Sequence, residues 1–298
     1  MMKVSLGPVL YHWGRQSMVE FYEAAIDSQT DVIYLGETVC SKRTELTPNE
    51  WLELAEGLQD RGKQIVLSTQ TLLETPADHK LLQRYCDNDK LLFEANDMGA
   101  VGILSNKRLP FVVGAAINCY NAHTLQQLRQ LGMQRWVMPV ELSRQWLLDV
   151  ISEAKQLGCD MGFEREVFAY GYLPLAYSAR CFTSRHENRP KSDCQQCCIQ
   201  YPQGLTVNSQ EGQALFTING IQTQSGYCYN LINDIPSMQG LVDIVRISPL
   251  SLNSLETAEQ FKRTAELGLT DNIATGGECN GYWHNLTGMT MLNTEQQV

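Results

Sequence analysis

Residues 32–37 read Val32-Ile-Tyr-Leu-Gly-Glu37, a short β-branched run of the kind that forms a buried strand. A helical pattern follows and begins at Thr47-Pro48, where threonine suits the N-cap and proline the first helical position. Gln64–Ser68 is the next strand-like run. A strand, a helix and a second strand in this order predict a β-α-β unit with parallel strands.

The same alternation continues along most of the chain. The eight strand candidates are Val4–Pro8, Val32–Glu37, Gln64–Ser68, Ala100–Leu104, Phe111–Asn118, Arg135–Val140, Gly162–Tyr170 and Val242–Ser248. The helical patterns between them are Val19–Ile26, Pro48–Leu58, His123–Leu131, Ser143–Leu157 and Glu256–Leu267. Eight alternating strands predict an α/β fold of the (β/α)8, TIM-barrel-like type. Because the gap between Ala100–Leu104 and Phe111–Asn118 is too short for a helix, we expect an irregular barrel, with an open doubly wound sheet as the alternative.

Residues 181–226 do not follow this alternation. A polar loop comes first, and two short strand-like runs, Leu205–Val207 and Ala214–Ile218, then flank a turn. We therefore predict one barrel domain over residues 1–298, with 181–226 as an inserted loop and hairpin between the seventh strand and a helix at Leu231–Met238. Long excursions of this kind usually carry function or disorder.

The bulk composition, with 43% hydrophobic and 19% charged residues, is that of an ordinary soluble protein. The formal net charge of −10 argues against a nucleic-acid partner, since such binding requires many lysines and arginines. No apolar run is long enough to span a bilayer. The first thirteen residues also lack the pattern of a signal peptide, so we expect a cytoplasmic location.

Cysteines are the main chemical signal in the sequence. Cys181 and Cys194 are separated by twelve residues that are almost all polar, and Cys198 follows shortly after. Thiols spaced along a solvated loop indicate metal or cluster ligation. Cys40 comes three residues after the second predicted strand, whereas Cys181 follows the seventh. Because loops after barrel strands gather at one face, we expect Cys40 at the same mouth as the other three.

Spacing alone does not choose the metal. A [4Fe–4S] cluster needs four thiolates, of which only some are usually close in sequence. Cys194 and Cys197 have the spacing of one zinc-binding pair, and His186 could complete a Cys₃His zinc site. Cys197 is ambiguous between ligand and bystander. The isolated thiols are predicted to be small buried hydrophobes, namely Cys86, Cys119, Cys159, Cys228 and Cys279.

Polar residues from other strand ends are expected at the same mouth. They are Glu37, Asn118, Glu141, Tyr170 and Arg246. Each is as consistent with a structural hydrogen bond as with catalysis. Arg180, Arg185 and Arg246 could hold an anionic ligand, since guanidinium groups pair with carboxylates in a bidentate manner. The catalytic residues stay unknown at this point.

Two motifs resemble a known family. Glu166-Val-Phe-Ala-Tyr-Gly171 and Tyr177-Ser-Ala-Arg-Cys181 resemble the signature of the collagenase-like peptidases, whose catalytic type is unassigned. The resemblance extends over most of the chain, including Leu215–Gly220 and Asp243–Arg246. The family motif normally has a cysteine three residues after the glycine at Gly171, but this chain has Pro174 there. The resemblance suggests that Cys40 replaces that missing ligand.

The resemblance implies an iron–sulfur protein of oxygen-independent ubiquinone biosynthesis. It implies a [4Fe–4S] cluster held by Cys40, Cys181, Cys194 and Cys198. It also implies a heterodimer with a UbiU-like cluster protein, which supports anaerobic ring hydroxylation, and a UbiT-like lipid carrier that presents the prenylated substrate.

Three other functions are weighed against this one. They are a peptidase, an RNA base hydroxylase of the same family and a zinc-stabilised scaffold. The sequence has no His-Glu-x-x-His motif, no nucleophile elbow and no evident histidine partner for an exposed thiol, so an active peptidase is not expected.

Overall fold

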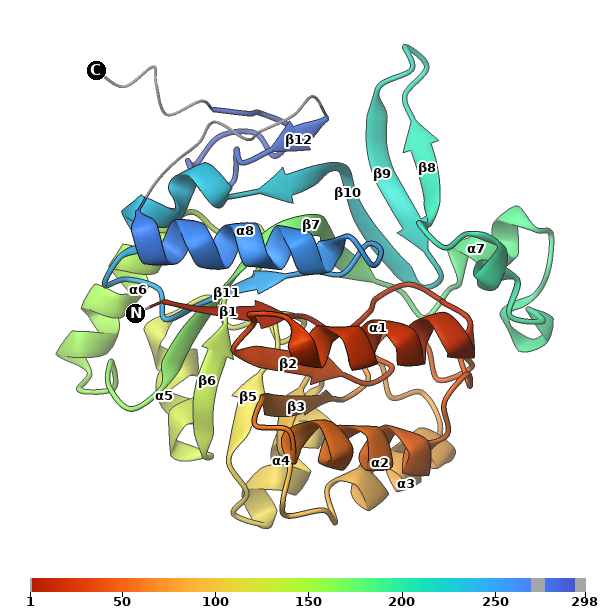
Figure 1. The fold of residues 1–298 in the computed structure, drawn as a ribbon, viewed down its shortest axis with the longest axis horizontal. Helices are drawn as coiled ribbons and strands as arrows, with labels where there is room; N and C mark the ends of the chain where they lie inside the picture. The colour runs from red at the N-terminus through yellow and green to blue at the C-terminus, as the bar shows by residue number, and fades with distance from the viewer. Residues whose placement is uncertain (1, 269–276, 293–298) are drawn as a thin grey trace.

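Eight parallel strands close into a barrel in the computed structural model, which describes residues 2–268 and 277–292 (Figure 1). The barrel strands are β1 (Lys3–Leu6), β2 (Val32–Leu35), β3 (Gln64–Ser68), β4 (Leu92–Ala95), β5 (Phe111–Val113), β6 (Met133–Val137), β7 (Glu164–Tyr177) and β11 (Ile244–Ile247). Neighbours pair in chain order, and β11 pairs with both β7 and β1, which closes the ring. The predicted TIM-barrel fold is confirmed.

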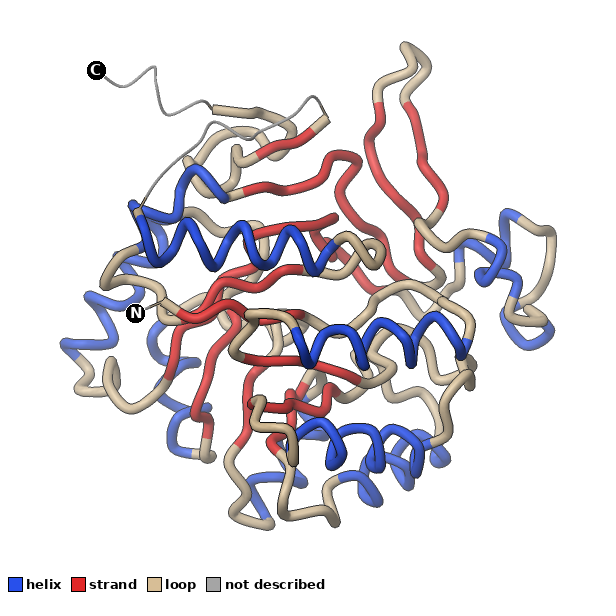
Figure 2. Tube along the Cα trace, viewed as in Figure 1, coloured by secondary structure: helices blue, strands red, loops and turns tan. Residues whose placement is uncertain are grey.

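Helices lie around the outside of this barrel (Figure 2). They are α1 (Arg15–Asp27), α2 (Pro48–Gln59), α3 (Pro76–Tyr85), α4 (Met98–Asn106), α5 (Ala122–Gln130), α6 (Arg144–Gln156) and α8 (Ser254–Leu267). Thr47 and Thr75 each cap a helix with a complete capping box followed by proline. The five predicted helices are confirmed within a few residues, and α3 and α4 are additional.

The predicted strand at Ala100–Leu104 is wrong, because these residues belong to α4. Asp97 caps this helix, with its Oδ1 accepting the Gly99 backbone N–H at 2.6 Å. The apolar residues of the segment are spaced so that they lie on one helical face against the barrel. The fourth strand is β4, further upstream, which leaves room for α4 before β5. The open-sheet alternative is therefore wrong, and the short connection on which the expected irregularity rested does not exist, although the β5–β6 and β7–β11 pairings contain register shifts.

Strand β7 is much longer than its neighbours and continues beyond the barrel. Its second half pairs antiparallel with β10 (Gln222–Asn230), which is followed outward by β9 (Ala214–Asn219) and β8 (Leu205–Asn208). Strands β8 and β9 form a hairpin that projects from the molecule (Figure 1). The short strand β12 (Glu278–Cys279) pairs in parallel with the C-terminal part of β10, at Cys228 and Tyr229.

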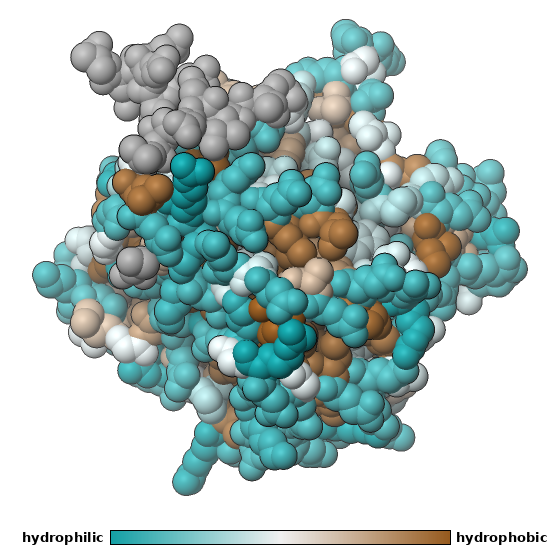
Figure 3. All heavy atoms as spheres, viewed as in Figure 1, coloured by the Kyte–Doolittle hydropathy of each residue, from teal (hydrophilic) through white to brown (hydrophobic). Residues whose placement is uncertain are grey.

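Short helical turns complete the insertion and its return to the barrel. They are α7 (Phe182–His186) and the 3-10 helices η1 (Lys191–Asp193), η2 (Cys197–Gln200) and η3 (Ile232–Met238). The helix predicted at Leu231–Met238 is therefore a 3-10 helix with Pro236 inside it. The visible face of the molecule is mostly hydrophilic with small apolar patches (Figure 3). No helix among the described residues is long and apolar enough to cross a membrane.

Charged side chains fill part of the barrel interior. Arg246 of β11 donates from Nε to Glu166 Oε1 and from Nη1 to Glu94 Oε1, both at 2.7 Å. The Arg246 guanidinium also lies over the Tyr34 ring, 4.0 Å from its centroid. Burial alone would raise the pKa of Glu166, but Arg246 and Arg135 outweigh it and hold the pKa below its usual value. Glu166 is therefore a buried carboxylate that depends on two cations.

We expect Glu166→Gln to lower the free energy of unfolding by about 3–5 kcal/mol, because it leaves a buried guanidinium partly uncompensated. Urea unfolding of the variant and of wild type at neutral pH measures this difference. Since the folded-state pKa of Glu166 is lowered, its contribution is present above the carboxyl pKa of the unfolded chain and is lost as the pH falls through the folded value. The two proteins should therefore converge in acid.

Glu53→Gln on the exposed face of α2 is the control, and its stability should stay within about 0.5 kcal/mol of wild type. Equal, small losses in the two variants would contradict the structural role of Glu166.

Candidate metal centre

Five thiols line one small cavity at the carboxyl ends of the barrel strands. They are Cys40, Cys181, Cys194, Cys197 and Cys198. Cys40 comes from the loop after β2, whereas the others come from the insertion after β7. Lys42, Arg43, Lys191, Gln196 and Gly220 complete the wall. The structure thus brings together the four cysteines singled out in the sequence, with Cys197 as a fifth.

Glu37 fixes the loop that carries Cys40. Its Oε1 accepts the backbone N–H of Val39 at 2.8 Å and that of Cys40 at 3.0 Å. Burial raises the pKa of the Cys40 thiol to about 11. A buried thiol of this kind is a poor nucleophile near neutral pH, although binding a metal would deprotonate it.

Backbone strain shapes the loop around the other thiols. Gln195 and Gln196 both adopt left-handed conformations, with φ of 46° and 51°. A non-glycine residue in this region costs about 1–3 kcal/mol. The two residues tighten the turn, and the Cys197 backbone N–H reaches the Cys194 carbonyl at 3.1 Å. Cys181 is the N-cap of α7, and its Sγ accepts the Ser184 backbone N–H at 3.4 Å.

Side chains tie the two loops to each other. Lys42 donates from Nζ to the Lys191 carbonyl and, at 3.2 Å, to the Ser192 carbonyl. Gln196 donates from Nε2 to Thr44 Oγ1 at 3.3 Å. The distance between Cys40 and the insertion is therefore set by direct hydrogen bonds and not only by the barrel.

Two further residues that the sequence analysis missed contact the thiols. His12 Nδ1 lies 3.2 Å from Cys198 Sγ, and His12 Nε2 lies 3.2 Å from Glu45 Oε1. The imidazole is almost fully buried, with 1% of its side chain exposed, and burial lowers its pKa. His12 follows the first strand closely in sequence, and this position after a barrel strand was the signal that could have revealed it.

Arg43, the second of these residues, places a buried positive charge beside the sulfurs. Its Nη1 donates to the Leu10 carbonyl and its Nη2 to Asn219 Oδ1, both at 2.7 Å, and it pairs with Glu37 at 3.8 Å. Its Nε has no hydrogen-bond partner among the described residues. Burial raises the pKa of Cys198, and the Arg43 charge opposes that rise. Arg43 is thus placed to stabilise negative charge in the cavity.

The thiols of the described residues do not form a compact tetrahedral zinc site. A tetrahedral zinc site holds its sulfurs about 3.8 Å apart, a spacing that follows from the Zn–S bond length. No three His, Cys, Asp or Glu residues in the described ranges are gathered closely enough to hold one metal ion. His186 packs edge-to-face against Tyr201, with ring centroids 6.1 Å apart, and does not line the cavity. The five thiols nevertheless line one cavity together with the buried Arg43 guanidinium, whose charge would offset negative charge on thiolates.

The remaining polar residues predicted at the mouth lie apart from the thiols. Asn118 lines a different cavity beside Asn96, and Glu141 accepts a hydrogen bond from Tyr120. Tyr170 packs on Phe261 of α8, outside the barrel. Arg246 is engaged inside the barrel, whereas Arg180 and Arg185 are exposed, so these arginines do not form the single anion site considered from the sequence.

The isolated cysteines mostly behave as predicted. Cys86, Cys119, Cys159 and Cys279 are buried, whereas Cys228 is half-buried.

A closed parallel barrel with a thiol-lined cavity at its carboxyl-terminal mouth defines a TIM-barrel protein with a candidate metal centre. The family model described as Peptidase family U32 matches residues 17–269. This chain belongs to that family.

Several solved structures are similar to this chain at low sequence identity. The U32 peptidase Mk0906 is 13% identical, with a TM-score of 0.45 over 84% of this chain and 93% of that one. Dihydropteroate synthase from Thermus thermophilus is 10% identical, with a TM-score of 0.43 over 90% and 93%. KGPDC from Streptococcus mutans is 14% identical, with a TM-score of 0.42 over 90% and 99%.

We expect Gly220→Ala to disturb the thiol cavity. Gly220 has a φ of +65°, and a Cβ there would lie 3.1 Å from Arg43 Nη2. The left-handed conformation alone costs an alanine about 1–2 kcal/mol, and the contact would push on the arginine beside the sulfurs. Urea unfolding should therefore show a loss of stability of that size or more.

Gly57→Ala, within α2, is the matched control, because no atom lies within 4 Å of the added Cβ. It should raise stability by up to about 1 kcal/mol through helix propensity. A Gly220→Ala protein as stable as wild type would show that this wall is not tightly packed.

Proposed function

We propose that this protein is a UbiV-like iron–sulfur protein of oxygen-independent ubiquinone biosynthesis. The observation that carries the proposal is the position of Cys40, which lines the same cavity as Cys181, Cys194 and Cys198. Pro174, at the position where the family signature normally has cysteine, instead lines a separate cavity inside the barrel mouth. In this proposal Cys40 supplies the ligand that the family signature normally provides with the cysteine at the position of Pro174.

In this proposal Cys40, Cys181, Cys194 and Cys198 hold a [4Fe–4S] cluster. The bound cluster supplies one-electron redox chemistry. The chain contributes the buried charge of Arg43, which offsets negative charge on the thiolates, and a contact from His12 to Cys198. Hydrogen bonds to the sulfurs and burial of the cluster are the means by which a protein sets the reduction potential of such a centre.

The proposed protein does not act alone. It forms a heterodimer with a UbiU-like cluster protein, and the pair hydroxylates the ring of the quinone precursor without dioxygen. A UbiT-like lipid carrier presents the prenylated substrate. The support for these partners is the resemblance of the sequence motifs and of the thiol set, together with membership of the U32 family.

A cysteine peptidase is the second candidate, and the Cys198–His12–Glu45 contacts favour it. The sequence analysis found no histidine partner for a thiol, but the structure places His12 between Cys198 and Glu45. His12 also borders a groove lined by Trp13, Ile199 and others. Against this function, burial raises the pKa of Cys198 and lowers that of His12, which disfavours the thiolate–imidazolium pair that such a nucleophile needs.

Metal analysis of anaerobically purified protein tests the proposal. Wild type should contain about four iron and four sulfide per chain, as one [4Fe–4S] cluster requires. Cys40→Ala should lose most of both, because three remaining thiolates hold such a cluster poorly. Cys228→Ala is the control, since Cys228 is equally half-buried but lies outside the cavity. This variant should keep the wild-type content.

Two results would decide against the proposal. Zinc without iron in wild type would favour a zinc-stabilised scaffold. An iron content that is unchanged in Cys40→Ala would show that Cys40 is not a ligand and would contradict the proposed ligand set. Comparison of Cys197→Ala with Cys198→Ala then separates ligand from bystander, with iron loss expected only in the second. Rapid alkylation of Cys198 by iodoacetamide at neutral pH, abolished by His12→Ala, would instead favour the peptidase.

A further inference from the structure

An open groove of about 400 Å³ lies at the barrel mouth, between the start of α1, the turn η2 and the loop before α8. The apolar part of its wall consists of Trp13, Phe21, Ile199, Pro202, Leu250 and Leu252. Ile199 and Leu252 are 43% and 57% exposed, so this apolar surface faces the solvent. An exposed apolar patch with polar surroundings marks an interaction site. Because His12 also lines it, we refer to it as the His12 groove.

The His12 groove reaches the thiols of the proposed metal centre. His12 Nδ1 lies 3.2 Å from Cys198 Sγ, on the opposite side of the imidazole from the groove's polar neighbour Glu45. Ile199 of the wall directly follows Cys198 in the chain. The four proposed ligands are each only half-buried. A molecule seated in the groove is therefore separated from the Cys198 sulfur by a single side chain.

A lobe formed by residues 180–200 borders the groove. It comprises α7, η1 and η2 and lies at one edge of the molecule (Figure 1). His186 of α7 packs against Tyr201, and the next residue, Pro202, belongs to the groove wall. The lobe and the His12 groove are therefore parts of one continuous surface.

This lobe is basic, although the chain as a whole has a formal charge of −10. It holds four basic residues against two acidic ones, Glu187 and Asp193. Arg180, Arg185 and Arg189 are exposed, and their guanidinium groups have no ion-pair partner among the described residues. Three unpaired arginines on one small lobe leave a local positive charge that an external anionic group can neutralise.

The charge pattern indicates the kind of partner. Glu20 lines the groove itself, so the groove favours an uncharged apolar side chain, and an anionic surface fits only over the lobe. Contacts between electron-transfer proteins are typically small, and interfaces commonly have an apolar centre with a polar rim in which arginine is enriched. A nucleic acid requires cations along a wider surface, which this acidic chain does not offer.

We propose that the His12 groove and the basic lobe form the docking face for a small acidic protein that carries one electron. An apolar side chain of that partner occupies the groove, and its carboxylates face Arg180, Arg185 and Arg189. The inference rests on the proposed function in one respect, because the partner is identified as an electron carrier from the position of this face over the proposed centre. The docking itself requires no iron.

Binding of a strongly acidic plant-type [2Fe–2S] ferredoxin to the anaerobically purified full chain tests the proposal by biolayer interferometry. Because the net charge of the chain repels an acidic protein, binding of this probe requires a local cationic face. The affinity should fall at least tenfold between about 20 mM and about 200 mM salt, since salt screens exposed charges.

Charge reversal identifies the lobe as the binding surface. At about 100 mM salt, Arg185→Glu combined with Arg189→Glu should weaken ferredoxin binding at least tenfold. Arg263→Glu combined with Lys155→Glu is the matched control, because both residues are exposed, on α8 and α6, and the net charge changes equally. The control should stay within about twofold of wild type. Equal affinities of the two double variants would refute the docking face.

Leu252→Ser tests the apolar groove separately from the charges. It should weaken binding about fivefold at either salt concentration, as the loss of one buried leucine side chain predicts. Leu267→Ser is the control, since both leucines are 57% exposed but Leu267 lies at the end of α8 and does not line the groove. Ferredoxin binding that is unchanged in Leu252→Ser would contradict a partner side chain in the groove.

Two other occupants would overturn the proposal. A dimer of the chain in sedimentation experiments that is lost in the lobe variant would assign the face to a second copy. Tighter binding of a single-stranded RNA oligonucleotide than of ferredoxin would assign it to RNA.

Iron analysis of the same samples separates this inference from the proposed function. Salt-dependent ferredoxin binding to a protein that contains no iron would retain the docking face and remove the metal centre. An iron-containing protein that does not bind ferredoxin would do the reverse.

Discussion

The buried arginine of β11 is the interaction on which the barrel depends. Arg246 reaches Glu166 of the neighbouring strand β7 and Glu94 of β4, which does not pair with β11. A charge in this position is stable only when carboxylates compensate it, and the carboxylates in turn need the cation. The ion pairs therefore tie β11 both to its neighbour β7 and to the more distant strand β4.

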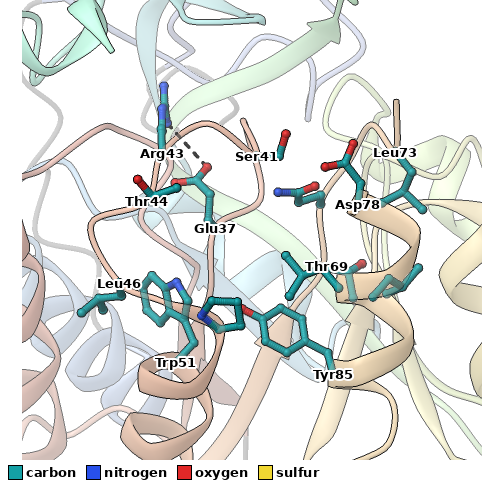
Figure 4. Close-up of a pocket in the computed structure, with 14 residues that line it drawn as sticks. Glu37, Ser41, Arg43, Thr44, Leu46, Trp51, Thr69, Leu73, Asp78 and Tyr85 are labelled. Atoms are coloured by element: carbon teal, nitrogen blue, oxygen red, sulfur yellow. Dashed lines mark ion pairs between the residues drawn. The ribbon is translucent and has the colours of Figure 1, made fainter. Parts of the chain in front are cut away.

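Closure of the barrel is what makes a shared site possible. Cys40 and Cys181 are far apart in sequence, but both follow strands whose carboxyl ends face the same side. The extension of β7 carries the chain outward, and the insertion folds back until Lys42 bonds to the Lys191 carbonyl. Arg43 lines both the thiol cavity and a second cavity bordered by α2 and α3 (Figure 4).

Sequence patterns predicted an element correctly where its residue types and its burial favoured the same secondary structure. The strand at Gln64–Ser68 and the helix after Thr47 were predictable, because a short buried apolar run and a capping threonine act over a few residues. The error at Ala100–Leu104 arose because a short apolar run fits either a buried strand or a helix face. Asp97, a helix cap just upstream, was the overlooked signal.

The sequence by itself determined the alternation of strands and helices, the thiol-rich insertion and the membership of a family. These features depend on residue type and spacing, which are local. Only the tertiary structure decided that His12 contacts Cys198, that Arg43 is buried beside the thiols and that Gln70 faces a cavity without a partner among the described residues. Such contacts join residues from separate loops, and their distances depend on how the closed barrel orients each strand end.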